Sequence, residues 1–279
     1  MSKKREIPVF NHPLMETHCH LDYLKDEALE QTIAAARAVG VERIVTIAVS
    51  PDNLNTVRHI AESHPMVWGT QGIHPHDAKD YSDAVHEQIR VNARTDRMVA
   101  IGEIGLDYYY EHSDRSRQRE VFERQLQLAI ELDLPIVVHT READADTEAI
   151  LRNFTADLRQ RGVIHSFTSG MVLAEYCLGE GFHLGFNGIS TFNRADNVRE
   201  VIAMTPLTQI LFETDSPYLT PVPYRGKPNA PYYLPFIAEK VAAVKQVSLE
   251  TLLPQVWHNS LGLFFPAEAE VSAGNQTAA

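Results

Sequence analysis

The chain has 279 residues, a hydrophobic content of 44% and a formal net charge of −12 at pH 7. These values are ordinary for a soluble globular protein, and the length suits either two small domains or one barrel-sized domain. The acidic balance argues against a protein that wraps long duplexes, because neutralising many phosphates requires a basic surface. It leaves open a small phosphorylated substrate, or a strand end held at a metal cluster.

Cysteine content and hydropathy indicate the compartment. Cys19 and Cys177 are the two cysteines, too few for a disulfide framework, which fits a reducing cytoplasm. No run approaches the roughly 18 apolar residues of a membrane span, and no apolar signal-peptide segment follows the basic start. We expect a cytoplasmic protein with no membrane partner. The sequence does not fix the oligomeric state, for which a monomer is the working expectation.

Short apolar, β-branched runs alternate with segments of helical periodicity along the chain. The runs predict strands at residues 14–20, 43–49, 66–72, 98–102, 135–139, 162–165, 182–186 and 209–212. The periodic segments predict helices at residues 26–39, 51–63, 82–94, 115–132, 143–161, 171–180, 197–204, 232–244 and 249–265. Before the second helix, Ser50 and Pro51 are typical of an N-cap and a first helical residue.

This alternation of strands and helices, without a break in composition, predicts a single-domain α/β fold of the (β/α)8 TIM-barrel type. The barrel would span residues 14–266, after an N-terminal extension at residues 1–13. Residues 267–279 are small and polar, and we expect them to be disordered. An open doubly wound sheet with extra elements is the structural alternative.

Ligand-type side chains stand at or just past the ends of the predicted strands. They are His18, His20, Glu103, His139, His165 and Asp215. Because the C-terminal ends of parallel barrel strands form one rim, these side chains would meet there. Each histidine alone is equally consistent with a hydrogen-bonded core or cleft residue, but the shared placement favours a divalent-metal site. Imidazole mixed with carboxylate suits Zn, Mn, Fe, Ni or Mg without choosing among them.

Spacing and burial suggest roles within this set. His18 and His20 stand two residues apart, so they share a strand face and would reach one metal. A carboxylate at Glu103, directly after a buried strand, is unfavourable unless it ligates a metal or pairs with an arginine. If Glu103 bridges two ions, these would lower the pKa of a shared water and stabilise the attacking and leaving oxygens. Glu213 and Asp215 share a face by spacing, so one would be a ligand and the other its neighbour. If Asp215 is the ligand, it could also act as the general base.

The motifs of this chain, in their order, resemble those of the TatD-family metal-dependent deoxyribonucleases, within the amidohydrolase-like barrel hydrolases. The resemblance extends from about Met15 to Phe265. The motifs are Thr-His-Cys-His-Leu-Asp (17–22), Gly-Ile-His-Pro-His (72–76), Ile-Gly-Glu-Ile-Gly-Leu-Asp-Tyr-Tyr (101–109), His-Thr-Arg-Glu-Ala (139–143), His-Ser-Phe (165–167), Glu-Thr-Asp-Ser-Pro-Tyr-Leu-Thr-Pro (213–221) and Arg-Gly-Lys-Pro-Asn (225–229).

The resemblance implies a dinuclear centre and a nuclease activity. The first of two divalent ions would be held by His18, His20, Glu103 and Asp215, and the second by Glu103, His139 and His165. The implied reaction is 3′–5′ exonuclease cleavage of phosphodiester bonds in single-stranded DNA, or in another small phosphodiester substrate. Asp215, Glu103 and His74 would be the catalytic residues. His74 matches a histidine that contacts the substrate phosphate or assists the leaving group; the alternative is a turn-stabilising role.

Four further residues in these motifs are not assigned as metal ligands or catalytic residues. Arg225 and Lys227 either supply positive charge near a phosphate or are solvated loop charges. Asp22 and Asp107 are expected to be structural partners of the site rather than ligands.

Two departures from the family pattern concern the site. Glu16 stands where aspartate is usual, and its longer side chain would alter the surroundings of the ligands. The loop Ser-Phe-Thr-Ser-Gly (166–170) has one residue more than usual before its glycine, which makes the shape of this loop uncertain but leaves His165 as a ligand.

Two rival functions remain open. The first is hydrolysis of an amide, ester or lactone at the same metals, including D-aminoacyl-tRNA deacylation, since this architecture hosts many such reactions. The second is metal binding without turnover, against which the intact ligands and the aspartate base argue.

Overall fold

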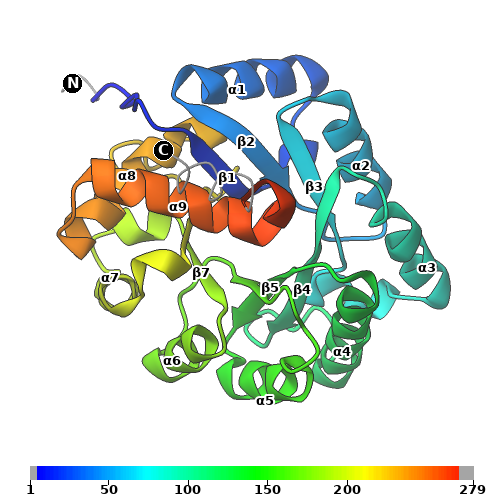
Figure 1. Ribbon diagram of the computed structural model, residues 1–279. Helices are drawn as coiled ribbons and strands as arrows, with labels where there is room; N and C mark the ends of the chain where they lie inside the picture. The colour runs from blue at the N-terminus through cyan, green and yellow to red at the C-terminus, as the bar shows by residue number, and fades with distance from the viewer. Residues whose placement is uncertain (1–4, 270–279) are drawn as a thin grey trace.

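Eight parallel strands form a barrel at the centre of the molecule (Figure 1). The computed structural model describes residues 5–269. The strands pair in chain order from β1 to β8. They are β1 (Leu14–Cys19), β2 (Val41–Thr46), β3 (Val67–Gln71), β4 (Met98–Asp107), β5 (Ile136–Arg141), β6 (Gly162–Ile164), β7 (His183–Phe186) and β8 (Ile210–Phe212). The (β/α)8 barrel expected from the alternating pattern is confirmed.

The segment after β8 connects the last strand back to the first. The Asp215 amide donates to the His18 carbonyl (2.9 Å), and the His20 amide donates to the Ser216 carbonyl (2.8 Å). These backbone bonds bring the C-terminal end of β1 against the chain that leaves β8. Two segments far apart in the sequence thereby meet at one rim of the barrel.

The helices lie around the outside of the strands (Figure 1). They are α1 (Asp26–Ala38), α2 (Leu54–Ser63), α3 (Asp83–Asn92), α4 (Arg115–Leu132), α5 (Asp144–Phe154), α6 (Met171–Gly179), α7 (Asp196–Met204), α8 (Leu234–Lys245) and α9 (Leu249–Phe264). The main apolar core lies between the strands and this helical layer. Within residues 5–269, every helix is too short or too polar to cross a membrane.

The inside of the barrel is filled by a separate apolar cluster. Val45, Val99 and Val137 belong to it together with Leu261 and Phe264 from the end of α9. The last helix therefore covers the inner core, and this burial of apolar surface favours the closed barrel. The polar groups discussed below lie at the other rim, where the strands end.

Three local predictions from sequence were wrong. Helix α2 begins at Leu54 rather than after Ser50, because Asn53 Oδ1 accepts hydrogen bonds from the Val49 and Ser50 amides (3.0 and 3.1 Å) and closes a turn there. Strand β4 continues five residues beyond the predicted end, because its last part pairs with β5 as far as Asp107. Helix α5 ends at Phe154, well before the predicted residue 161.

The two chain ends differ in part from the expected extension and tail. Residues 5–13 precede the barrel, and Arg5 is bound to Glu239 of α8 (2.8 Å). The disorder expected from residue 267 does not begin there, since residues 266–269 form a helical turn. In this turn Glu268 pairs with Arg43 (2.6 Å) and Ala269 is buried. The rest of the expected tail, residues 270–279, and residues 1–4 lie outside the described residues.

Candidate metal centre

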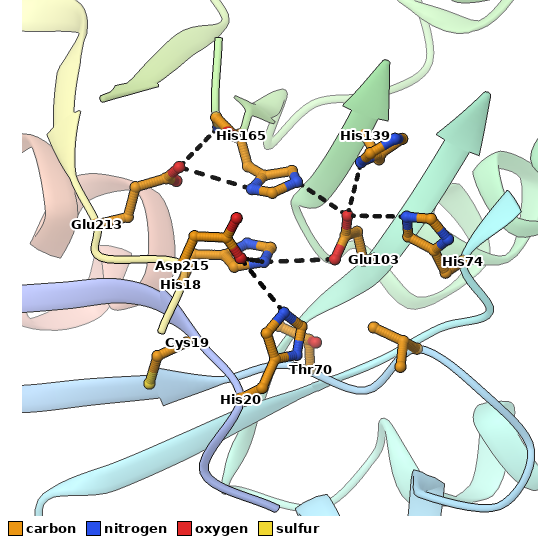
Figure 2. Close-up of polar contacts among 12 residues, drawn as sticks. His18, Cys19, His20, Thr70, His74, Glu103, His139, His165, Glu213 and Asp215 are labelled. Atoms are coloured by element: carbon orange, nitrogen blue, oxygen red, sulfur yellow. Dashed lines mark hydrogen bonds and ion pairs between the residues drawn. The ribbon is translucent and has the colours of Figure 1, made fainter. Parts of the chain in front are cut away.

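The barrel brings all six predicted ligand residues to one rim (Figure 2). All of them except His18, which is buried beside Glu103, line a single cavity. The cavity has a volume of about 600 Å³. The residues come from β1, β4 and β5 and from the segments directly after β1, β6 and β8. They are His18, His20, Glu103, His139, His165 and Asp215.

Glu103 is the residue that the others share. Its Oε1 lies 3.0 Å from His139 Nδ1 and 2.9 Å from His165 Nε2. The same oxygen lies 3.4 Å from His74 Nε2, while Oε2 lies 3.3 Å from His18 Nε2. Figure 2 shows the carboxylate between these rings. One carboxylate oxygen thus faces His139, His165 and His74, and the other faces His18.

Asp215 completes the side of the cavity next to β1. Its Oδ1 lies 3.4 Å from His20 Nε2 and 3.8 Å from His18 Nε2. The aspartate has a positive φ of 56°, a conformation that few residues other than glycine adopt. The backbone bond from Asp215 to His18 holds it there, so the chain is turned to direct this carboxylate at the histidines.

The backbone of β4 lies unusually close to β5, which brings Glu103 to its place. A Cβ on Gly102 would lie 2.6 Å from Val137 Cβ, and one on Gly105 would lie 2.0 Å from the His139 carbonyl oxygen. Neither distance is compatible with a side chain, and Gly105 also has a φ of +133°. Glycine at both positions is therefore required for this approach.

At this site, several buried imidazole nitrogens make no hydrogen bond within residues 5–269, although two of them lie beside a Glu103 oxygen. They are both ring nitrogens of His18 and His165, and Nδ1 of His20. Because buried polar atoms are nearly always partnered in native proteins, such a group of orphan nitrogens needs an explanation. Imidazole lone pairs beside ionised carboxylates are the ligand set of a divalent ion such as Zn²⁺ or Mn²⁺. The residues present fit a bound metal.

A family model described as TatD related DNase matches residues 15–265. The chain belongs to the TatD family. It is 36% identical over 252 residues to the uncharacterized metal-dependent hydrolase YabD of Bacillus subtilis, covering 90% of this chain and 98% of that protein. It is 36% identical to the 3′-5′ ssDNA/RNA exonuclease TatD of a Pantoea species, covering 84% and 92% of the two chains. A TatD-type metal-dependent hydrolase is thus the class of enzyme to which the chain belongs.

A solved structure agrees with this assignment. The crystal structure of the TatD homologue YjjV from Escherichia coli superposes with a TM-score of 0.85 at 29% sequence identity. It covers 90% of this chain and 97% of the other.

The electrostatics of this TatD site keep its carboxylates ionised. Burial alone would raise the pKa of Glu103, but His165 and His74 hold it well below its usual range. In the same way, burial would raise the pKa of Asp215, but His20 and His18 outweigh burial and lower it. The pKa of His165 would fall on burial, yet Glu103 raises it well above 6.5. Two negative groups and neighbouring imidazoles therefore stabilise one another.

Asp107 was expected to be a structural partner, and the structure places it behind the ligands. Its Oδ2 lies 3.0 Å from His139 Nε2 and 3.0 Å from His76 Nε2. Its Oδ1 accepts from the Tyr109 and Tyr110 amides (3.0 and 2.9 Å). Sequence reasoning missed His76, although it stands in the motif at residues 72–76. Asp22 lies further out and accepts from Asn53 Nδ2 (3.0 Å).

The first departure from the TatD pattern is accommodated by backbone hydrogen bonds. Glu16 is fully buried, and its Oε1 accepts from the His18 and Thr214 amides (3.0 and 2.9 Å). Burial raises the pKa of Glu16 to about 8, and the bonds to Thr214 and His18 only partly oppose this. The longer side chain thus ties β1 to the chain after β8 without entering the cavity lining.

The second departure, the longer loop at residues 166–170, begins directly beside His165. The Ser166 amide donates to Glu213 Oε1 (2.6 Å), and Phe167 is buried below the loop. Thr168 is exposed and lines the cavity. The loop thus contributes Thr168 to the cavity wall, while His165 points toward Glu103 (Figure 2).

Proposed function

We propose that the chain hydrolyses phosphodiester bonds as a 3′–5′ exonuclease on single-stranded DNA, with two divalent ions as cofactors. The observation that carries this proposal is Glu103, whose Oε1 is 2.9 Å from His165 Nε2 and whose Oε2 is 3.3 Å from His18 Nε2. A carboxylate with one oxygen toward each of two ligand groups is suited to bridge two ions. The exonuclease name of the Pantoea relative supports the class of substrate.

The proposed ligands divide into two sets that share Glu103. The first set is His18, His20, Glu103 and Asp215, and the second is Glu103, His139 and His165. When bound, the ions would activate a water and stabilise negative charge on the phosphoryl oxygens; Mg, Mn, Zn, Ni and Fe are all candidates.

Asp215 is proposed to accept the proton from the attacking water. Its side chain is 14% exposed and lines the cavity, so a water beside the ligands can reach it. Because its pKa is lowered by His20 and His18 against the effect of burial, the carboxylate is ionised at neutral pH. An ionised carboxylate at the reacting water is the requirement for a general base.

His74 is proposed to contact the substrate phosphate rather than a metal. Its Nδ1 accepts a hydrogen bond from the His76 amide (3.1 Å), so a neutral ring carries its proton on Nε2. Burial and His139 lower the pKa of His74 to about 4, which makes the neutral ring the form present at pH 7. The Nε2–H group faces the cavity beside Glu103 and would donate to a phosphoryl oxygen or leaving group. The turn-stabilising role and the substrate role therefore use different nitrogens.

Nuclease assays test the proposal directly. Purified chain loaded with each candidate metal is expected to shorten 5′-labelled single-stranded DNA, and Asp215→Asn is expected to lower the rate about 10²-fold to 10⁴-fold with unchanged circular dichroism. Asp83→Asn, at an exposed ion pair with Arg124, is the matched control and should keep full activity. Undiminished cleavage by Asp215→Asn would point to a contaminating nuclease.

A substrate panel separates the rival reactions. A 3′-blocked oligonucleotide, a small phosphodiester, a p-nitrophenyl ester, a lactone and a D-aminoacyl-tRNA would be tested with the same preparations. Cleavage only of the ester, lactone or aminoacyl substrates would replace the nuclease proposal with that rival. Stoichiometric metal without turnover on any of them would indicate a metal-binding protein.

We further propose that the protein acts in the cytoplasm as a monomer. Cys19 and Cys177 are both free and buried, which suits a reducing compartment. Light scattering after gel filtration tests the monomer, and fractionation of cells that express the tagged protein tests the compartment.

A further inference from the structure

A second cavity lies beside the metal centre, at the rim where α7 begins. Its volume is about 340 Å³. Thr168 and Ile189 line both this cavity and the metal cavity, so the two share a wall. The other side is formed by Phe192, Arg194 and Arg225. We call it the arginine cavity.

Specific contacts hold the two loops that form this cavity. The Val222 amide donates to Thr191 Oγ1 (2.9 Å), which joins the loop after β8 to the loop after β7. A Cβ on Gly188 would lie 1.8 Å from the Leu219 carbonyl oxygen, so only glycine permits this close approach. These two contacts hold the loop after β7 against the loop after β8.

The arginine cavity carries positive charge in an otherwise acidic protein. Arg194 and Arg225 are exposed, and within residues 5–269 neither guanidinium has a carboxylate partner. The acid nearest in sequence, Asp196, is paired instead with Arg199 (2.6 Å). No acidic residue is found in the cavity lining of this described part of the chain.

Arg225 is held in a geometry suited to an anion. Its guanidinium carbon lies 3.7 Å from the centre of the Phe192 ring. Stacking on an aromatic ring occupies the face of the guanidinium and leaves the N–H groups at its edge free to donate. Those donors match the oxygens of a phosphate group, which arginine binds through two parallel hydrogen bonds.

We propose that the arginine cavity binds a neighbouring phosphate of the same nucleic-acid strand whose terminal phosphodiester lies at the metal centre. Arg194 and Arg225 would thus make the enzyme prefer oligonucleotides over substrates with a single phosphodiester. The strand would leave the metal centre across Thr168 and Ile189, toward α7. This inference rests on the proposed phosphodiesterase function.

Kinetics on substrates of two lengths test the preference. With a dinucleotide and a 12-residue oligodeoxynucleotide, Arg225→Ala is expected to raise KM for the longer substrate about tenfold and to leave both constants for the dinucleotide unchanged. Arg225→Lys, which keeps the charge but not the paired donors, should fall between. Arg159→Ala removes the same charge at an exposed ion pair with Asp133 and should change neither substrate. Equal losses on both substrates, or on neither, would overturn the proposal.

Binding without turnover separates this inference from the nuclease proposal. In excess chelator, the affinity for a fluorescein-labelled 12-residue strand is measured against salt concentration. The Arg194→Ala, Arg225→Ala double variant should reduce the salt slope by about 0.7, because the cavity would hold one phosphate and each phosphate contact on a single strand contributes about 0.7. Arg159→Ala, at the exposed ion pair with Asp133, should leave the slope unchanged.

Each result of the binding experiment decides one of the two proposals. An unchanged slope in the double variant, an equal drop in Arg159→Ala, or no affinity of the wild type for the strand would overturn the arginine cavity even if the enzyme is a nuclease. A reduced slope without cleavage of either substrate under any metal would retain the cavity and refute the nuclease.

Discussion

Asp107 Oδ2 lies 3.0 Å from Nε2 of His139, on the side of the imidazole that is turned away from the proposed metal position. Burial would raise the pKa of Asp107, but its bonds from His139 and His76 hold it below the usual range. An ionised acceptor at Nε2 keeps the proton on that nitrogen and leaves the Nδ1 lone pair toward Glu103, which lies 3.0 Å away. A carboxylate behind a ligating histidine is a common means of orienting the ring and raising its basicity.

Asp107→Asn should therefore weaken metal binding without unfolding the protein. An asparagine has one acceptor oxygen, so it cannot serve His139 on one side and the Tyr109 and Tyr110 amides on the other. We expect the affinity for the more weakly held ion to fall about 10-fold to 100-fold, measured by competition with a chromophoric chelator. Asp146→Asn, at a half-exposed carboxylate bound to Arg119, is the control. An unchanged affinity would show that Asp107 only supports the turn.

The fold was predictable because buried parallel strands and amphipathic helices leave strong patterns in sequence. Helix α4 has the predicted bounds, Arg115–Leu132. The errors arose where tertiary contacts decide. In the middle of β4, Gly102 is followed by the charged residue Glu103, and this pair is atypical of a strand interior. Pairing with β5 nevertheless extends the strand to Asp107. At Asn53, a side chain bonds backward to the Ser50 amide and delays the helix, which local propensity does not reveal.

The six clustered residues were predictable because strand ends of a parallel barrel share one rim. The groups around them were less so. The contact of His76 with Asp107 depends on how far β4 extends and on the turn after β3. The arginine cavity joins loops at residues 188–195 and 222–225, which share no pattern in sequence. Such features follow from loop packing and are found only in three dimensions.

Glu103→Gln should reduce the metal content from two ions to one or none. The amide keeps the size of the side chain but loses the charge and one of the two acceptor oxygens that face His18 and His165. Metal per chain would be measured by mass spectrometry after dialysis against trace metal. Glu131→Gln, at an exposed ion pair with Arg90 (3.3 Å), is the matched control and should keep the wild-type metal content. Two ions retained in Glu103→Gln would refute the bridging role.

His74→Ala should lower kcat without loss of metal. If Nε2–H donates to the substrate phosphate, its removal should lower the rate about 10²-fold while both ions remain bound. Because burial and His139 lower the pKa of His74 to about 4, the pH dependence of kcat/KM between pH 6 and 8 should keep its shape in the variant. Loss of one ion in His74→Ala would instead identify a ligand, as its position beside Glu103 and His139 also permits.

Glu16→Gln should make the metal-free protein more stable at high pH. The folded-state pKa of about 8 lies above the ordinary value of 4.5, so between these values the unfolded chain is ionised while the folded chain keeps its proton. The free energy of unfolding of the wild type therefore falls as pH rises from 4.5 to 8. Glutamine resembles the protonated acid and should remove this loss, which amounts to about 4 kcal/mol. Urea titrations of both proteins in chelator, at pH 5 and 8, measure the difference.

His183→Gln should reduce the loss of stability at low pH, whereas Glu16→Gln reduces the loss at high pH. His183 is not one of the proposed ligands. His183 begins β7, and its Nδ1 is buried without a hydrogen bond among residues 5–269. Burial lowers the pKa of His183 from 6.5 to about 4, and the bond with the Gly162 backbone opposes this only in part. Above pH 6.5 the ring is neutral in both the folded and the unfolded chain, so its full contribution to the free energy of unfolding is present. As pH falls from 6.5 to 4, only the unfolded chain gains the proton, so stability is lost.

The variant should therefore lose about 3 kcal/mol less than the wild type over that interval. The free energy of unfolding from urea titrations at pH 7, 6, 5 and 4.5, again in chelator, gives both curves. His59→Gln, on the exposed face of α2, controls for the loss of an imidazole as such. Parallel curves for wild type and His183→Gln would show that His183 accepts a proton in the folded barrel as readily as in the unfolded chain. Water would then reach the start of β7, contrary to the burial of Nδ1 described above.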